Sequence, residues 1–195
     1  FFDNHVEFVN HFLKGQIAME DVRRELMAQA AKMERTGLPL THVDSHQHMH
    51  MLPGVIDISL DVAASLNLDA VRISRTPLFT AFAGMGQLIG RLGLFTLSEL
   101  SLWKAKRRHF RVPDHFEGIV AGEAVHEGHF LHILKDLRPG TTEVMMHPGT
   151  DNEKLIPACD WEHDFEAEMQ AIVSPKVRRM IADKAVKVVN YRDLK

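Results

Sequence analysis

The chain has 195 residues, of which 45% are hydrophobic and 25% charged, a balance typical of a folded globular domain and too apolar for a disordered segment. Its 26 acidic and 23 basic residues give a net charge of -3, so we expect no basic surface for nucleic acid or for an anionic membrane. The one cysteine, Cys159, excludes an internal disulfide framework and fits a reducing compartment. A cytoplasmic location does not follow from one residue, but it is the location that we expect.

The first predicted helix covers residues 19–35. Val22, Leu26 and Ala30 recur at helical spacing, acidic residues occupy the first turn, and Gly37 follows the last turn. Further along the chain, predicted helices alternate with predicted extended segments. The patterns predict helices over residues 53–66, 97–110, 123–137, 165–172 and 175–183, and extended segments over residues 41–45, 70–73, 117–120, 142–146 and 186–191.

This alternation predicts the fold class. Strands separated by helices of this length favour an α/β fold of right-handed β-α-β units with a mostly parallel sheet. One domain is enough to hold residues 1–195. The length falls short of the roughly 250 residues of a complete eight-stranded β/α barrel, so a barrel without its first strands fits the pattern. The chain begins with Phe1 rather than methionine, and we expect a native N-terminal segment to precede it.

The most informative segment is residues 42–50, which holds four of the 13 histidines: His42, His46, His48 and His50. These histidines and Asp44 occupy even positions, so they point to one face as long as the chain stays extended. Imidazole is a good ligand for borderline divalent metals, and a nearby carboxylate can bind the metal, orient a histidine or act as a base. The alternative is a solvated or hydrogen-bonded strand end that is rich in histidine.

Two later residues are further candidates. His147 precedes Pro148 and Gly149, so we expect it where a strand leaves the sheet, the edge at which parallel α/β folds build their sites. A capping or core histidine is the alternative. Arg72 lies in a predicted strand. Facing inward it needs a carboxylate partner, because an unpaired buried charge is costly, and facing outward it is solvated.

Together these segments resemble the YdjC-like carbohydrate deacetylases, a family that includes the chitooligosaccharide deacetylases. The resemblance rests, in chain order, on Asp-Ser-His-Gln-His-Met-His at residues 44–50, on Pro53 and Arg72, on His-Pro-Gly at residues 147–149 and on Asn-Tyr-Arg-Asp-Leu at residues 190–194. It implies a distorted β/α barrel related to polysaccharide deacetylases. It also implies one divalent metal ion, Mg²⁺ or Zn²⁺, and removal of acetyl groups from a small N-acetylated sugar or oligosaccharide. A homodimer is one compatible assembly.

The resemblance assigns a role to each candidate residue. His46 is the implied metal ligand, and Asp44 is an implied catalytic carboxylate of the same site. Arg72 is the side chain that orients a catalytic carboxylate, and His147 is the implied proton donor. The remaining two histidines line the site as substrate-binding or supporting groups: His48 and His50.

The chain departs from the family pattern at its beginning. Family members begin with a strand that ends in Asp-Asp-Phe-Gly and supplies an aspartate, and a later Gly-x-His motif adds a ligand, but residues 1–5 match neither motif. We therefore expect missing N-terminal β/α units, and an inactive metal-binding scaffold is one alternative. Another is a metal-free histidine-triad nucleotide hydrolase, since residues 46–52 approach its His-x-His-x-His pattern. That alternative leaves Arg72 and His147 unexplained.

Two apolar features have either ordinary or substrate-related roles. Residues 80–93 form a glycine-punctuated apolar segment, for which core packing, a lid over a sugar site and a dimer surface are the alternatives. The longer apolar stretch over residues 78–95 is interrupted by Gln87, Arg91 and four glycines, so it does not supply the run of about 20 apolar residues that a membrane helix needs. Trp103 and Trp161 are candidates either for stacking on sugar rings or for ordinary packing.

Overall fold

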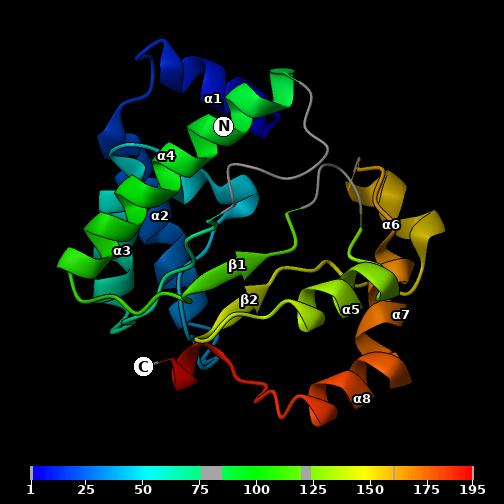
Figure 1. Ribbon diagram of the computed structural model, residues 1–195. Helices are drawn as coiled ribbons and strands as arrows, with labels where there is room; N and C mark the ends of the chain where they lie inside the picture. The colour runs from blue at the N-terminus through cyan, green and yellow to red at the C-terminus, as the bar shows by residue number, and fades with distance from the viewer. Residues whose placement is uncertain (1, 76–84, 120–123, 160, 195) are drawn as a thin grey trace. The chain divides into compact units, whose positions relative to one another are not determined.

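The computed structural model describes residues 2–75, 85–119, 124–159 and 161–194 (Figure 1). The chain divides by its internal contacts into two compact units, Phe1–Val112 with Tyr191–Lys195, and Pro113–Asn190. This division leaves the expected single domain a prediction. Among the described helices, none combines the length and the apolar character that a membrane span needs.

The first unit contains helices α1 (His5–Leu13), α2 (Met19–Glu34), α3 (Val55–Ser65) and α4 (Met85–Arg107), and the 3₁₀ turns η1 (His46–Met51) and η2 (Tyr191–Asp193). Helix α3 contacts α2, α4 and η1, so it connects the elements of this unit. Ile56 and Leu60 on α3 join a core cluster with Val71, whereas Ile58 and Val62 pack with residues of α2. A helix that is apolar on most sides is expected in such a buried position.

Three extended segments run beside this core. Val43 pairs in parallel with Val71, and Ala70 pairs in parallel with Arg111. The Val43 N–H donates to the Ala70 carbonyl at 3.2 Å, and the Arg72 N–H donates to the Val43 carbonyl at 3.0 Å. The extended conformation predicted for residues 41–45 and 70–73 is therefore confirmed at these pairs, and it brings Asp44 next to Arg72.

The second unit combines a parallel pair of strands, β1 (His115–Glu117) and β2 (Thr142–Val144), with helices α5 (Glu127–Lys135), α6 (Asn152–Cys159), α7 (Phe165–Val173) and α8 (Pro175–Asp183). Helices α5, α7 and α8 contact one another. Gly118 follows β1 with φ +100°, and a Cβ atom there would lie 2.2 Å from the Met145 carbonyl oxygen. Only glycine allows this close approach of the two strand ends.

The structure confirms most of the predicted elements. Helices α2, α3, α5, α7 and α8 and strand β2 lie within a few residues of their predicted ranges. Strand β1 overlaps the predicted segment 117–120 at Glu117, and residue 120 lies outside the described residues. Helix α4 begins earlier than predicted, at Met85. Part of the apolar segment 80–93 lies outside the described residues, so its role as lid, dimer surface or core stays a prediction.

One predicted strand is wrong, and two helices were not predicted. Residues 186–190 are irregular and Val188 is 75% exposed, so the β-branched run has no partner strand among the described residues. Helix α1 has an N-cap signal in Asn4, whose side chain accepts the Glu7 N–H at 2.9 Å. Helix α6 contains Pro157, which argues against a helix when only the sequence is considered.

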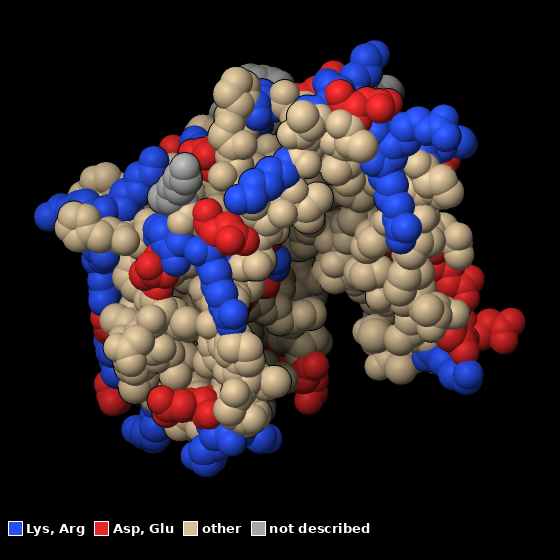
Figure 2. Space-filling model, turned by 90° about the horizontal axis from the view of Figure 1, so that it is seen from below, with Lys and Arg blue, Asp and Glu red and all other residues tan. Residues whose placement is uncertain are grey.

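The architecture is thus a helix-rich α/β fold with a small parallel sheet, as predicted at that level. The more specific β/α barrel stays a prediction. On the face drawn in Figure 2, lysine and arginine side chains lie among aspartate and glutamate side chains, in keeping with the net charge of -3.

Asp61 connects three helices of the first unit. Its carboxylate accepts hydrogen bonds from Arg23 on α2 at 2.8 Å and from Arg108, just after α4, at 2.7 Å. Partial burial raises the pKa of Asp61, but the hydrogen bonds and charges of the two arginines outweigh this effect and hold the pKa below its ordinary value of 3.8. The ionised carboxylate is therefore the form that stabilises the fold.

We expect Asp61→Asn to lower the free energy of unfolding by about 1 kcal/mol at pH 7, since solvent screens this partly exposed cluster. The lowered pKa means that the stabilisation is present above pH 3.8 and is lost as the pH falls through the folded-state pKa. Urea unfolding at pH 7 and pH 3 checks both points. Asp21→Asn, in an exposed pair with Arg24, is the matched control and should change little. An unchanged gap between wild type and Asp61→Asn at pH 3 would contradict this assignment.

Candidate functional site

The histidine-rich segment does not stay extended. The chain turns after Ser45 into η1, where Gln47 and His48 have φ of 51° and 58°, in the left-handed region. The Ser45 hydroxyl oxygen closes the turn by accepting the His50 N–H at 2.9 Å. The extended conformation therefore ends at Ser45, and the even spacing of His46, His48 and His50 does not determine where these side chains point.

His50 is held at both nitrogens of its ring. Nε2 lies 2.7 Å from the Arg72 carbonyl oxygen, which only accepts, so Nε2 carries the proton and donates it. Nδ1 lies 2.8 Å from the Ser45 hydroxyl and accepts from it in this tautomer. The ring is 2% exposed. His50 therefore ties the turn to the strand at Arg72, and with both nitrogens engaged it does not offer a metal ligand in this arrangement.

Asp44 and Arg72 form an ion pair between Oδ2 and Nη1. Both side chains are partly buried, and the second carboxylate oxygen of Asp44 accepts the Ser45 N–H at 2.7 Å. An inward Arg72 was expected to need a carboxylate partner, and Asp44 provides it. The carboxylate is thus fixed in orientation at the end of its extended segment, directly before η1.

His48 and Ser74 also belong to this region. We call the region the η1 cluster, and its members are Asp44, Ser45, His48, His50, Arg72 and Ser74. The ring of His48 lies with Nδ1 2.8 Å from the hydroxyl of Ser74. His46 is exposed, and its ring lies edge-on to the ring of His5 with centroids 5.9 Å apart. His42 points elsewhere, because it stacks on Tyr191 with centroids 3.7 Å apart.

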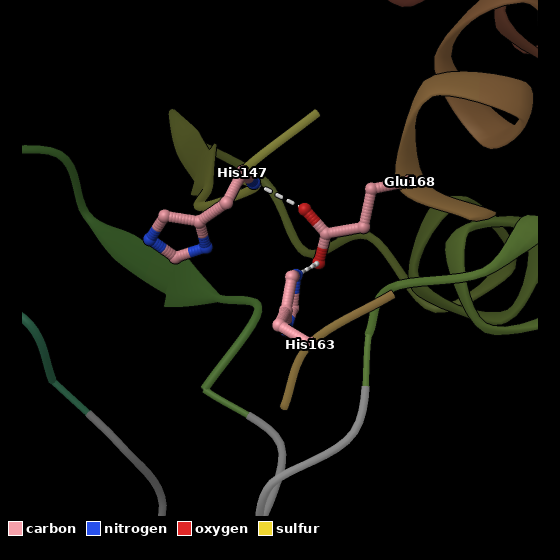
Figure 3. A group of neighbouring side chains, drawn as sticks. All are labelled: His147, His163 and Glu168. Carbon is pink, nitrogen blue, oxygen red and sulfur yellow. Dashed lines mark hydrogen bonds and ion pairs between the residues drawn. The ribbon is translucent and has the colours of Figure 1, made fainter. Parts of the chain in front are cut away.

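A second cluster lies in the other unit, at the end of β2. His147, His163 and Glu168 offer ligand atoms that all lie within 4.8 Å of one another (Figure 3). His147 is exposed, whereas His163 and Glu168 are buried. Two imidazoles and a carboxylate form a donor set that suits zinc and similar divalent ions. Within the described residues this is the group of three potential ligands that the structure brings together.

Glu168 is the centre of this second cluster, which we call the β2 cluster. The side chain of Glu168 is 2% exposed. Oε2 accepts the backbone N–H of His147, and Oε1 accepts the N–H of Val125 at 2.9 Å. Nε2 of His163 lies 3.2 Å from Oε1, yet it makes no hydrogen bond within the described residues. Buried polar groups in this state are uncommon, and a bound cation is one way to satisfy such a nitrogen.

Aromatic rings surround the β2 cluster. The ring of His163 stacks on Trp161 with centroids 4.0 Å apart and planes 20° apart. His147 and Phe165 both lie edge-on to Trp161, at 5.0 and 5.6 Å. The strand end, the loop before α7 and the first turn of α7 therefore contribute to one packed group.

The predicted site residues fall into two groups. Asp44, His48, His50 and Arg72 belong to the η1 cluster, and His46 lies in the same turn; His147 belongs to the β2 cluster of the other unit. His163 and Glu168 were not predicted. A signal existed for Glu168, because it shares helical spacing with Phe165 and Ala171, and an acidic residue on an apolar helix face is unusual unless it is paired.

The comparison with known proteins covers the residues of both clusters. The model of a family described as YdjC-like protein matches residues 1–183, a range that contains both clusters. The chain is 28% identical to the carbohydrate deacetylase of Mus musculus over 219 residues, which covers 100% of this chain and 68% of that protein. It is 27% identical to the carbohydrate deacetylase of Thermoanaerobacter pseudethanolicus over 177 residues, with 91% of this chain and 61% of that protein covered.

A human carbohydrate deacetylase is similar as well, at 27% identity over 100% of this chain and 66% of that protein. The chain therefore spans about two thirds of the length of these relatives.

Proposed function

This chain belongs to the YdjC-like protein family, and from that membership we propose that it is a metal-dependent carbohydrate deacetylase. It would hydrolyse the amide bond of an N-acetylated sugar or oligosaccharide and release acetate. The observation that carries this proposal is the family match over residues 1–183, which includes every candidate site residue, together with relatives named carbohydrate deacetylase. We also propose that the chain adopts the incomplete β/α barrel that the sequence predicts.

In the proposed reaction Asp44 is the catalytic carboxylate that receives a proton from water. Its ion pair with Arg72 and the N–H of Ser45 fix the carboxylate, which supports this role because a base must be held within reach of the proton it takes. His50 acts on Asp44 indirectly, since its Nε2–H binds the carbonyl of Arg72. His48 is the proposed substrate-facing member, held by Ser74.

His147 is the proposed proton donor to the leaving amine. Its exposure supports access to a substrate, and the bond from its N–H to buried Glu168 fixes its backbone at the end of β2. A histidine in this role takes part in proton transfer near neutral pH, which general acid catalysis requires.

Two sets of residues are candidates for holding the divalent ion. The family resemblance assigns His46 as a ligand, and its exposed ring is accessible to an ion. The β2 cluster has the donor set that fits, with the unsatisfied Nε2 of His163 as the supporting observation. When bound, a divalent cation polarises an amide carbonyl and lowers the pKa of a bound water. We propose His46 as the primary ligand.

Metal removal tests the proposal. We expect acetate release from a trimer of N-acetylglucosamine to fall to background after the protein is treated with a chelator, and to return when Zn²⁺ or Mg²⁺ is added back. The histidine-triad alternative predicts hydrolysis of a nucleotide that a chelator does not affect. Nucleotide hydrolysis without metal, and no acetate in any condition, would contradict the deacetylase proposal.

A further inference from the structure

Trp161 lies beside His147 and remains partly exposed. The residue is 37% exposed, although three aromatic neighbours contact its ring. The stacked neighbour is His163, whereas His147 and Phe165 meet it edge-on. A large apolar ring with one stacked partner and open area next to a candidate catalytic residue is a surface on which a flat ligand can lie.

Packing against His163 also fixes the position of the Trp161 ring. His163, which stacks on Trp161, is 6% exposed, and its Nε2 lies 3.2 Å from buried Glu168. The same carboxylate accepts the N–H of His147. One buried side chain therefore contacts both the residue under Trp161 and the backbone of His147. Such fixation lowers the ordering cost of binding, because the ring does not lose freedom when a ligand arrives.

Sugar rings suit such a surface. One face of an N-acetylglucosamine ring is formed by C–H groups, and it can cover an aromatic face while the hydroxyl groups keep contact with water or polar groups. The acetamido nitrogen is bonded directly to the sugar ring. A sugar that covers Trp161 therefore carries its amide close to the neighbouring His147 ring, whose centroid lies 5.0 Å from that of Trp161.

We propose that the exposed face of Trp161 is the platform on which a sugar ring of the substrate stacks, and that His163 and Glu168 are positioning residues that hold this platform at a fixed place beside His147. The inference rests on the proposed deacetylase function and adds to it the residue that recognises the sugar ring.

Trp103 offers a natural control, because the chain contains two tryptophans. Trp103 lies on α4 in the other unit, is 53% exposed and has the Arg107 guanidinium 4.8 Å from its ring centroid. The variant Trp103→Phe leaves Trp161 as the one indole fluorophore, and Trp161→Phe leaves Trp103. Both variants replace a partly exposed ring by another aromatic ring, so the packing under residue 161 is largely kept.

The test is a fluorescence titration of both variants with a trimer of N-acetylglucosamine. We expect a saturable change of the emission in Trp103→Phe, because the sugar removes water from the Trp161 ring, and no change in Trp161→Phe. By calorimetry, Trp161→Ala should bind the trimer about tenfold more weakly than wild type, and Trp103→Ala should bind it equally well. The loss should appear mainly in KM rather than in kcat, which a general loss of folded protein would not produce.

The outcomes separate the platform from the function. If wild type binds the trimer and releases acetate, but the emission of Trp103→Phe does not change and Trp161→Ala binds as tightly as wild type, the platform is wrong and the deacetylase function stands. If wild type neither binds the trimer nor releases acetate, the proposed function fails and the platform fails with it. A response confined to Trp161→Phe also overturns the platform.

Discussion

Replacing His147 by alanine should lower kcat for acetate release roughly 10²–10⁴-fold while the bound metal is retained, since general acid catalysis contributes on this scale. The expectation follows from the position of His147, exposed at the end of β2 with its backbone fixed by Glu168. Replacing His46 by alanine should lower both turnover and metal content. Elemental analysis of purified protein gives the metal content, and an acetate assay gives the rate.

His132→Ala is the matched control for loss of a histidine. His132 lies on α5 in the same unit as His147, and it is exposed and paired with Asp136 one helical turn away. It should keep both activity and metal. Equal loss of metal in His147→Ala and His46→Ala would contradict the division of roles. Loss of metal in His147→Ala and His163→Ala, with none in His46→Ala, would assign the metal site to the β2 cluster.

Replacing Glu168 by glutamine should lower the free energy of unfolding by about 3 kcal/mol, a large change for one nearly isosteric substitution. The two carboxylate oxygens accept the backbone N–H groups of His147 and Val125 in a buried place. Glutamine has one oxygen, so its amide N–H₂ must face one of these donors. Urea unfolding monitored by circular dichroism measures the change.

Glu166→Gln is the control for this variant, because Glu166 lies on the same helix two residues earlier and is exposed. Its carboxylate accepts the Asn152 N–H at 3.2 Å at the surface, so its substitution should change stability by less than about 0.5 kcal/mol. If Glu168→Gln and Glu166→Gln have equal stability, the role assigned to the buried carboxylate is wrong.

The predicted elements that the structure confirms are those with local signals. Helices α2 and α8 carry end signals and periodic apolar residues, and their bounds agree with the prediction within one residue. Residues 186–191 show the limit of this reasoning, because a strand also needs a neighbour, and that neighbour is set by tertiary structure.

The site shows the same limit. The sequence pointed to Asp44, His46, Arg72 and His147 as candidates by residue type and order, and it predicted a carboxylate partner for an inward Arg72 without identifying Asp44 as that partner. The turn at Gln47 and His48 was not predicted, because positive φ in residues other than glycine has no dependable sequence signal. His163 and Glu168 are brought to His147 by the packing of α7, which local patterns do not reveal.

The most direct test of the central claim is mass spectrometry of a trimer of N-acetylglucosamine after incubation with metal-loaded protein, with acetate measured in the same sample. We expect an oligomer that has lost an acetyl group, with its glycosidic bonds intact and one acetate released for each acetyl group removed. An unchanged oligomer and no acetate, from folded protein with stoichiometric metal, would contradict it.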